Sequence, residues 1–368
     1  MLKWDEEYLR LCRKILSEGK EVENRTINNT IKIPSYNFNL DVSKEFPILT
    51  IKKLYSRQAF LELLWIYQVG SNDVNWLQDR KVSIWDEWKI DESGYWNAFQ
   101  KQVNIDGSHE IKEIHKYFGK EYAGTIGEAY GYIVNKYKGV DRVLDIIKNH
   151  PEARDNVMSL WYNCHLDKGV MRPCVWAHEV DITNGTLNMY VHQRSCDVPL
   201  GLPFNVTQFA ALMQMYARVG GYKVGTLSWS IKDAHIYTNQ VSMIKELLER
   251  GKTLAIYEGY KNKMWMEGQI ENYKEEYEKI LKTLTKEDLL NLKKGVVPEV
   301  LKDVDLKLKI CDYVLNPPSP KLWLNPDVKD FYKFNNDDEC KDIKVLKKQL
   351  SEVAKNVRVD KSDKEKDI

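Results

Sequence analysis

Apolar residues recur every three or four positions in three separate segments of the chain, which is the spacing of one face of an α-helix. This pattern predicts amphipathic helices over residues 4–17, 140–149 and 209–222, the last of them ending at Gly220-Gly221. Residues 56–68 are apolar almost all round, so a helix there is predicted to be buried. The chain is therefore expected to hold several long helices, one of them enclosed by the core.

Two segments fit β-strands instead. Residues 31–40 alternate between apolar and polar positions, and residues 227–231 fit a short strand just before a polar cluster. Helices and strands thus alternate along the chain, which indicates the mixed α/β (α+β) class. The sequence alone does not give the order of the strands in a sheet.

The C-terminal third differs in composition. Residues 270–294 are charged and helix-prone, and Pro317-Pro318-Ser319-Pro320 follows them. We interpret residues 251–320 as an inserted helical subdomain on the surface. Residues 341–368 are predicted to be a charged, flexible tail, because bulky apolar residues are almost absent after Val359.

Composition excludes several classes of partner. The 368 residues carry a formal net charge of +1, and 43% of them are hydrophobic, which is enough for one large or two smaller domains. A net charge near zero gives no general attraction to nucleic acid or membrane, so we expect neither as a partner. No segment approaches the roughly 20 apolar residues that cross a bilayer. Six cysteines without zinc-type spacing are typical of reduced thiols in a cytoplasmic protein.

Hydrogen-bonding side chains are concentrated between residues 171 and 208. In order, this segment contains Cys174 after a proline, Arg194-Ser195-Cys196-Asp197, and Gly201-Leu202-Pro203-Phe204-Asn205. A core strand seldom carries so many polar groups, because each would need a buried partner. The segment is therefore predicted to be a functional site.

These motifs resemble those of the folate-dependent thymidylate synthase family. The run Gln193–Asn205 and the later segment Asp233–Tyr237 match the family's central motifs in order and distance. The resemblance runs from about Tyr8 to Asp338, and it is closest to the subgroup with Pro-Cys-Val at the nucleophile, here Val175.

The resemblance implies a fold and an assembly. We expect a thymidylate synthase-type three-layer fold with a large bent mixed β-sheet, and an obligate homodimer in which two such sheets pack back to back. Residues 1–250 and 321–340 would form the catalytic domain, interrupted by the 251–320 subdomain.

The resemblance also implies an activity, the reductive methylation of dUMP to dTMP. Cys174 would add to C6 of uracil as a thiolate whose pKa is lowered by cationic neighbours such as Arg194. Asn205 would match O4 and N3–H of uracil, whereas an aspartate there would suit cytosine. Outside the family context, a lone cysteine is more often an inert buried thiol, and Asn205 fits a turn after Pro203.

Two side chains would serve proton transfer at C5 of the base. In the family a tyrosine at the position of Tyr130 lies beside that carbon, and Glu62 would act through ordered water. A carboxylate buried in the helix at 56–68 is expected to have a raised pKa. The alternative for Glu62 is a structural carboxylate paired with a neighbouring arginine.

Trp85 and Trp88, three residues apart, are expected to face the same side. In the family such a pair lines the folate pocket and keeps water from the reacting carbon, and Asp197 would bond the pterin ring. Simple packing is the alternative for the tryptophans. The co-substrate 5,10-methylenetetrahydrofolate supplies both the one-carbon unit and the hydride, so no metal is expected.

The resemblance assigns the rest of the nucleotide to polar side chains. His235 and Tyr237 would hold the ribose 3′-hydroxyl, although both fit a purely structural role in a strand. Guanidinium groups suit phosphate oxygens. The phosphate would be bound by Arg25, Arg194 and Ser195, with Arg154 reaching from the other subunit.

Two positions depart from the family pattern, and no apolar C-terminal ending is visible. Asp155 stands where a second arginine is usual and would repel a phosphate. Glu179 replaces a usual glutamine in a strand expected to face the cavity. These departures keep two alternatives open: a pyrimidine nucleotide hydroxymethylase acting on dUMP or dCMP, and a catalytically silent nucleotide-binding homologue.

Overall fold

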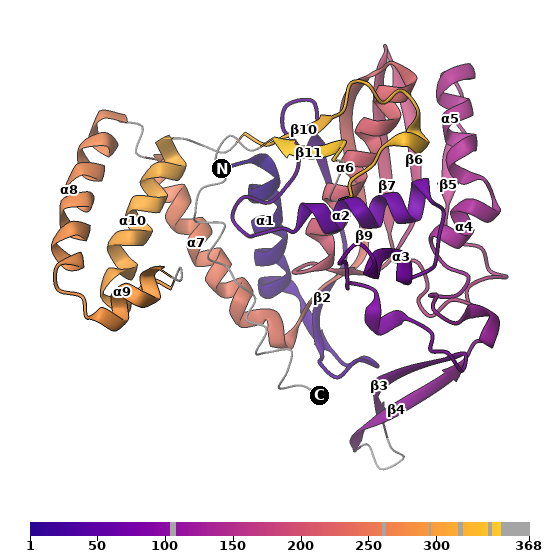
Figure 1. Cartoon of the computed structure of the whole chain (residues 1–368), viewed down its shortest axis with the longest axis horizontal. Helices are drawn as coiled ribbons and strands as arrows, with labels where there is room; N and C mark the ends of the chain where they lie inside the picture. The colour runs from indigo at the N-terminus through magenta and orange to yellow at the C-terminus, as the bar shows by residue number, and fades with distance from the viewer. Residues whose placement is uncertain (104–107, 260–262, 294–295, 316–318, 338–340, 347–368) are drawn as a thin grey trace.

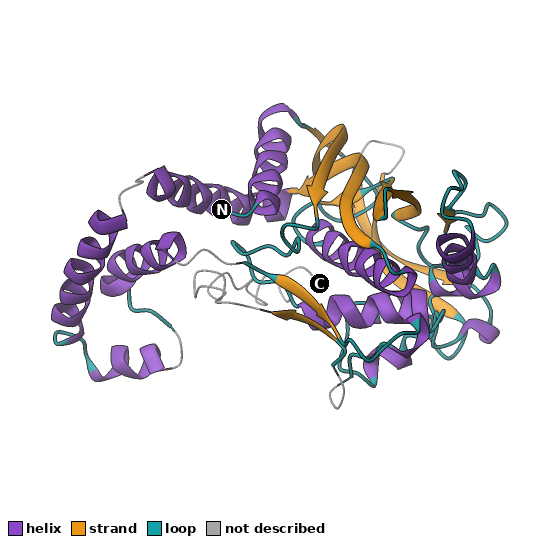
Figure 2. Ribbon diagram, turned by 90° about the horizontal axis from the view of Figure 1, so that it is seen from above, coloured by secondary structure: helices purple, strands orange, loops and turns teal. Residues whose placement is uncertain are grey.

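A computed structural model of the chain describes residues 1–103, 108–259, 263–293, 296–315, 319–337 and 341–346. Within these ranges a curved sheet and its helices form the main body, and a smaller lobe of helices lies to one side (Figure 1). Seen from above, the broad strands lie toward the upper edge of the body and helices lie below them in the view (Figure 2).

The central sheet is mixed. Its strands are β1 (Lys20–Val22), β2 (Thr30–Asp41), β5 (Val157–Ser159), β6 (Val175–Thr183), β7 (Thr186–Gln193), β8 (Cys196–Asp197) and β9 (Lys223–Tyr237). The order is β1-β2-β9-β7-β6-β5, with β8 paired to β9. β9 runs parallel to β7 and β8, whereas the other strand pairs described in this sheet are antiparallel.

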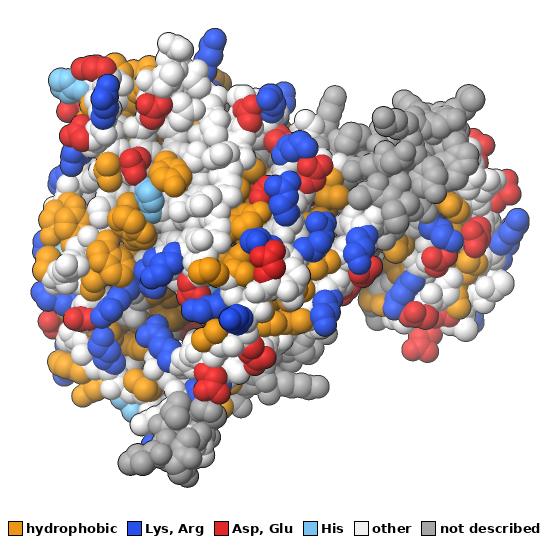
Figure 3. Space-filling view, turned by 180° about the vertical axis from the view of Figure 1, so that it is seen from behind, with side chains coloured by type: hydrophobic (Ala, Val, Ile, Leu, Met, Phe, Trp, Pro, Cys, Tyr) orange, Lys and Arg blue, Asp and Glu red, His pale blue; other side chains and the backbone are white. Residues whose placement is uncertain are grey.

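One face of the sheet is buried and the other is partly exposed. Along β9, the buried Leu227, Trp229 and Ile231 alternate with half-buried serines at 228 and 230. This alternation is that of a strand with one face in the core. On the outer face, Trp176 and Tyr190 are 36% and 39% exposed. Hydrophobic side chains gather with lysines and arginines on the side of the body seen in Figure 3.

The described helices confirm most of the helical predictions. They are α1 (Lys3–Glu18), α2 (Ser56–Leu63), α3 (Asn75–Gln78), α4 (Gly131–Lys136), α5 (Gly139–Asn149), α6 (Gly201–Gly220), α7 (Val241–Gly259), α8 (Lys263–Leu281), α9 (Lys286–Lys293) and α10 (Glu299–Leu315). The helix predicted over 209–222 begins earlier, at Gly201. Pro203 is tolerated there because the first turn of a helix does not use its backbone N–H groups.

The buried helix predicted over residues 56–68 contains a change of pitch. α2 continues as a π-helix, η1 (Leu64–Gln68), which is buried up to Tyr67. Gln68 at its end donates to the carbonyls of Phe331 and Phe334 at 2.9 and 2.7 Å. These bonds tie the end of η1 to the C-terminal part of the body.

Two small sheets lie outside the main one. β3 (Tyr95–Val103) and β4 (His109–Tyr117) form a hairpin that projects from the body in Figure 1. β10 (Lys321–Leu324) pairs with β11 (Ile343–Leu346). Residues 343–346 of the predicted flexible tail are therefore a strand. Residues 347–368 lie outside the described part of the chain, so the prediction for them stays a prediction.

The smaller lobe is helical. α8 and α10 pack together, and α10 also contacts α7, which in turn packs against α1 of the main body. Helices α8 and α9 cover most of the segment 270–294 that was predicted to be helical. Of the helices that the structure describes, none combines the length and apolar character needed to span a bilayer.

Candidate active site

A cavity of about 210 Å³ lies where α2, α6, and the turn η2 (Asp86–Trp88) meet. Four of the predicted catalytic side chains line it together: Glu62, Tyr130, Cys174 and Asn205. Trp85 and Trp88 also line it, which confirms that they share a side. The sequence motifs therefore converge on one enclosed space although they are far apart along the chain.

Cys174 lies immediately before β6, next to Arg194 and Tyr130. Its Sγ is 4.0 Å from Arg194 Nη2, and its backbone N–H donates to the Tyr130 hydroxyl at 3.1 Å. Burial raises the pKa of the Cys174 thiol, whereas the charges of Arg194 and Arg25 lower it. The prediction of a lowered pKa is wrong for the chain alone, because burial outweighs both guanidinium groups.

Arg194 is fixed against the loop that carries the cysteine. Its Nε donates to the Pro173 carbonyl at 2.9 Å, and its Nη2 donates to the Arg172 carbonyl at 2.7 Å. Its own backbone N–H donates to the Cys174 carbonyl at 2.8 Å. Two bonds from the guanidinium and one from the backbone therefore hold Arg194 against this loop, with its guanidinium beside the sulfur.

Tyr130 adopts a strained backbone conformation at the start of α4, with φ 45° and ψ −106°. A positive φ at a non-glycine residue costs about 1–3 kcal/mol and is commonly found at functional sites. The next residue must be small, because a Cβ on Gly131 would lie 2.0 Å from the Ser71 carbonyl oxygen. The Tyr130 ring contacts Trp85 edge-on at 5.3 Å.

Glu62 is half-buried, and its two carboxylate oxygens accept hydrogen bonds from neutral donors. Trp85 Nε1 donates to Oε1 at 2.6 Å, and Gln208 Nε2 donates to Oε2 at 2.5 Å. The alternative in which an arginine neutralises this carboxylate is therefore not what the described residues show. Burial raises the pKa of Glu62 to about 7, as predicted in direction. A carboxylic acid with that pKa can both release and accept a proton near neutral pH.

Asn205 belongs to a chain of hydrogen bonds with a fixed direction. Trp229 Nε1 donates to Gln193 Oε1 at 3.0 Å, and Gln193 Nε2 donates to Asn205 Oδ1 at 3.2 Å. Asn205 Nδ2 then donates to Gln208 Oε1 at 3.4 Å, and Gln208 donates to Glu62. An indole can only donate and a carboxylate can only accept, so the two ends determine how all three amides are turned.

This directed chain leaves Asn205 ready for a ligand. Each amide oxygen accepts two bonds and each amide nitrogen donates two, and the chain uses one of each on Asn205. One N–H and one lone pair remain for a partner that offers an acceptor beside a donor. O4 and N3–H of uracil form such a pair.

His235 and Tyr237 share one face of β9, as predicted, with ring centroids 5.2 Å apart. His235 Nδ1 lies 3.0 Å from the Asp233 carbonyl oxygen and donates to it. Asp197 is paired in register with His235 through β8 and β9. Burial raises the pKa of Asp197, and the charge of His235 opposes that effect.

A second cavity, of about 590 Å³, adjoins the first at Trp88. Arg25, Trp88 and Tyr237 are among the residues that line it. Ser195 is half-buried between β7 and β8, next to Arg194 in the chain. Arg25 and Tyr237, which were predicted for the phosphate and the ribose, thus line this second cavity. Arg194, also predicted for the phosphate, lies beside Cys174 instead.

Arg154 and Glu179 do not line the Cys174 cavity. They line a hollow of about 370 Å³ beside β6 and β7, where Glu179 pairs with His192 at 2.7 Å. The prediction that Glu179 faces the active-site cavity is wrong. The pairing of β6 with β7 shifts register between Val175 and Ala177, and one extra residue reverses which side chains point inward.

Asp155 is strongly exposed and lies 3.4 Å from Arg142. Its charge is therefore partly balanced within the chain.

Within the described ranges, no group of three or more His, Cys, Asp or Glu side chains could hold a metal ion.

The thymidylate synthase family model matches residues 6–285 of the chain. The chain belongs to the thymidylate synthase family. Thymidylate synthase from Clostridium beijerinckii is 35% identical over 335 residues, which are 91% of this chain and 92% of that protein. The enzyme from Corynebacterium aurimucosum is 34% identical over 248 residues, or 66% of this chain and 82% of that protein.

Solved structures agree with this assignment. Thermostable thymidylate synthase A from Bacillus subtilis matches with a TM-score of 0.62 at 28% identity, covering 93% of this chain and 94% of that one. The predicted family and the mixed α/β fold with a large mixed sheet are confirmed. Thymidylate synthases are methyltransferases that act on dUMP with 5,10-methylenetetrahydrofolate as co-substrate, as the motifs predicted.

The sequence did not single out Gln193, Gln208 or Trp229. Gln193 opens the quoted motif but looks like part of a strand. Gln208 is three residues after Asn205 on α6, so a shared helix face was the available signal. Trp229 lies in the middle of β9, where a tryptophan suggests packing alone. Only the folded structure shows that these three side chains together set the orientation of the Asn205 amide.

Proposed function

We propose that this chain makes dTMP from dUMP with Cys174 as the covalent nucleophile. The observation that supports this most directly is the one cavity lined by Cys174, Tyr130, Glu62 and Asn205. These side chains combine a thiol, an amide of fixed direction and an acid with a pKa near 7. Addition to a pyrimidine followed by removal of its C5 proton requires that combination.

Asn205 orients the base. Its Nδ2 donates to O4 and its Oδ1 accepts from N3–H, and both positions are left over from the chain of amides described above. The Cys174 sulfur forms a bond to C6, and the electrons of the C5–C6 double bond move through C4 onto O4. The donor of Asn205 stabilises this charge, and the Arg194 guanidinium favours the thiolate once the thiol proton has passed to solvent water.

Tyr130 and Glu62 handle the proton at C5. After a carbon is attached to C5, the C5 proton passes to Tyr130 and to water held by Glu62. Loss of this proton would let the bond between the transferred carbon and the folate nitrogen break, which leaves an exocyclic methylene on C5. Once a hydride has been added to that methylene, the C5–C6 double bond would re-form and the thiolate of Cys174 would leave C6. Because the pKa of Glu62 is about 7, it can accept the proton and return it to solvent.

The aromatic walls fit a reduced folate. Trp85 and Trp88 offer flat apolar surfaces in the cavity, and Trp88 is stacked on Trp96 at 5.6 Å. Asp197 would hydrogen-bond the pterin. The bound folate supplies the one-carbon unit and the hydride and is released as dihydrofolate. The tryptophans keep water away from the reacting carbon.

The phosphate and sugar lie on the other side of the base in this proposal. His235 and Tyr237 hold the ribose 3′-hydroxyl, which distinguishes deoxyribonucleotides from ribonucleotides. Guanidinium forks bind the phosphate. The residues that bind it are Arg25, Arg194, Ser195 and Arg154 of the partner subunit.

We infer a homodimer from the outer face of the sheet. Trp176 and Tyr190 are partly exposed there, close to the hollow lined by Arg154 and Glu179. Exposed aromatic side chains on a sheet are stabilised when a second sheet covers them. Arg154 is then a residue for the partner's phosphate site, which accounts for its absence from the Cys174 cavity.

The division into residues 1–250 with 321–340 and an inserted helical subdomain at 251–320 remains our proposal for the domains. The family match extends into the inserted segment, to residue 285. A cytoplasmic location likewise remains a prediction.

Release of tritium from 5-tritiated dUMP, measured together with dihydrofolate formation, tests the function. Both products are expected from the unaltered chain, and neither from Cys174→Ala. A hydroxymethylase would release tritium without oxidising the folate, and a silent homologue would release none. Both tryptophans line the cavity and Glu179 does not, so the hydroxymethylase has no specific contact in its favour.

A further inference from the structure

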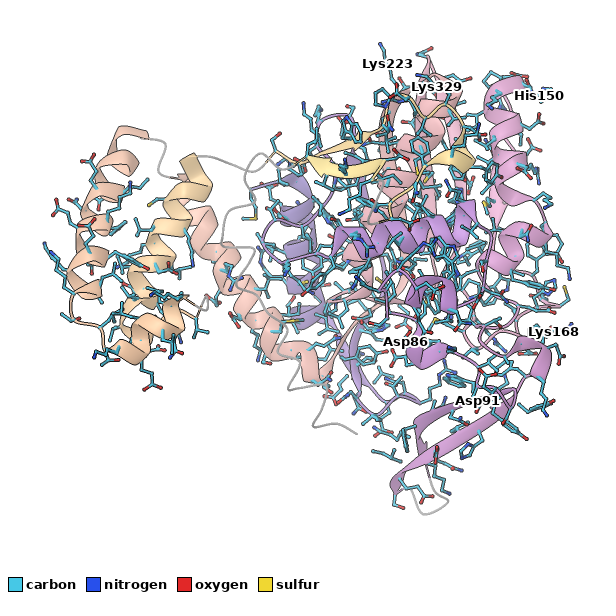
Figure 4. The ribbon with its side chains drawn as sticks, in the orientation of Figure 1. Asp86, Asp91, His150, Lys168, Lys223 and Lys329 are labelled. Carbon is cyan, nitrogen blue, oxygen red and sulfur yellow. The ribbon has the colours of Figure 1, made fainter. Side chains whose placement is uncertain are left out.

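The β3–β4 hairpin is firmly anchored to the main body by hydrogen bonds at its root. It leaves the body at Gly94 and returns at Gly119, whose N–H donates to the Gly94 carbonyl at 3.3 Å. At the root, the Asp91 carboxylate accepts from the Tyr95 N–H and the Asn97 amide, each at 3.0 Å. Figure 4 shows Asp91 at this root.

The root of the hairpin also packs against the turn η2, which carries Trp88. The Trp96 ring is stacked on Trp88 with centroids 5.6 Å apart and planes 12° apart. Trp96 Nε1 donates to the Glu87 carbonyl at 2.9 Å. Stacking and a hydrogen bond on one indole fix the direction of the hairpin relative to the site.

Further along, β3 holds the loop that carries Arg25. The Lys101 N–H donates to the Arg25 carbonyl at 3.0 Å, and Lys101 Nζ donates to Asn29 Oδ1 at 2.8 Å. The two bonds hold the loop on both sides of its Thr26 turn. Thr26 itself is tied inside the loop, because its N–H donates to Asn24 Oδ1 at 2.7 Å.

Arg25 depends on this support because its side chain is exposed. An exposed side chain is placed by its backbone more than by packing. The charge of Arg25 nevertheless reaches the site, since it lowers the pKa of Cys174 and of Tyr237 against the effect of burial. Where the loop lies therefore decides where this positive charge lies.

The hairpin and the loop both line the 590 Å³ cavity: Asn97 and Gln100 belong to β3, and Arg25 belongs to the loop that Lys101 holds. We propose that the β3–β4 hairpin is a wall of the nucleotide site and that Lys101 is a positioning residue that holds Arg25 toward the phosphate. This inference rests on the proposed assignment of Arg25 to the phosphate of dUMP.

Two substitutions at Lys101 separate its two bonds. Lys101→Met removes the Nζ bond to Asn29 only. Lys101→Pro also removes the N–H that donates to Arg25, and proline is tolerated where a strand N–H points away from its ladder partner. Lys112→Met is the matched control, because Lys112 is on β4 of the same hairpin and pairs with Glu110 at 2.6 Å.

Calorimetric titration with dUMP and with deoxyuridine gives the readout. We expect Lys101→Pro to weaken dUMP binding about tenfold, Lys101→Met about threefold, and Lys112→Met not at all. Deoxyuridine, which lacks the phosphate, should bind all three variants equally. A merely structural defect would weaken both ligands. At saturating dUMP the turnover number of Lys101→Pro should equal that of the unaltered chain, because only the phosphate end is affected.

A double-mutant cycle with Arg25→Ala completes the test. In that background Lys101→Pro should cause no further loss of dUMP affinity. Equal losses with and without Arg25, or no loss from Lys101→Pro, would overturn the role of the hairpin. If Arg25→Ala itself leaves dUMP binding unchanged, the phosphate assignment fails instead. If Lys101→Pro does not fold, as judged by loss of its thermal unfolding transition, Lys101→Met and Asn29→Ala provide the test. Each is expected to weaken dUMP binding about threefold, and the double variant should bind dUMP no more weakly than either single variant.

Discussion

Replacing Glu62 with glutamine should make the protein more stable at alkaline pH and inactive. In the native chain, burial holds the pKa of Glu62 at about 7, compared with 4.5 for an ordinary glutamate. The folded state thus binds this proton more tightly than the unfolded state does. Its stabilising contribution is complete below pH 4.5 and is lost as the pH rises to about 7.

The size of the effect follows from that difference. A shift of about 2.5 pKa units corresponds to roughly 3 kcal/mol, at about 1.36 kcal/mol per unit. Glutamine is neutral at every pH and avoids this loss. Its amide NH₂ faces the NH₂ of Gln208, however, so one hydrogen bond worth about 1 kcal/mol is lost. The free energy of unfolding of Glu62→Gln should therefore exceed that of the unaltered chain by about 2 kcal/mol at pH 8 and fall below it by about 1 kcal/mol at pH 4.5.

Urea unfolding followed by tryptophan fluorescence, at equal protein concentration and several pH values from 4.5 to 8, measures both numbers. Glu128→Gln is the control of opposite sign. Burial raises the pKa of Glu128, but hydrogen bonds from Tyr122 and His165 outweigh it and leave that pKa lowered. Its contribution is present above the ordinary pKa and lost in acid, so this variant should lose stability at neutral pH. A difference between Glu62→Gln and the unaltered chain that stays constant from pH 4.5 to 8 would refute the reasoning.

Three further outcomes are expected. Asn205→Asp should lower dUMP turnover by about 10- to 100-fold and raise that of dCMP, since a bidentate match is worth about 1–3 kcal/mol; steady-state kinetics with both nucleotides would contradict this if the preference stayed unchanged. Trp229→Phe removes the donor that directs the amides, so the KM for dUMP should rise several-fold while deoxyuridine and dUMP are affected alike. Mixing the inactive variants Arg154→Ala and Cys174→Ala under conditions of subunit exchange should restore tritium release, because one site of the mixed dimer then holds both residues. No recovery despite proven exchange would place Arg154 outside the partner's site.

Much of the site could be predicted because its chemistry is carried by short motifs. Cys174, Arg194 and Asn205 lie within the single segment 174–205, and turns rich in glycine and proline mark this segment in the sequence. Glu62 could be recognised because a carboxylate in an apolar helix needs an explanation. In each case the residue type is unusual for its local surroundings.

The remaining features depend on geometry that a linear pattern does not contain. If side chains alternated regularly from Val175 onward, Glu179 would face the Cys174 cavity. The register shift between Val175 and Ala177 turns Glu179 to the opposite face of the sheet. The pKa of Cys174 depends on how much burial opposes two arginines, which is a balance of distances. The contact between Lys101 and Arg25 joins residues 76 positions apart, and neither residue is unusual where it stands.

The directed chain from Trp229 to Glu62 has a consequence for engineering. The residue that would choose between nucleobases is set from the middle of the sheet, at a tryptophan that no substrate touches. Libraries confined to the walls of the pocket would keep that constraint intact and would tend to recover the original preference. Changing which pyrimidine the enzyme accepts should therefore begin in the interior. An acceptor in place of the Trp229 donor would reverse the direction of the amide hydrogen bonds and so turn the Asn205 amide.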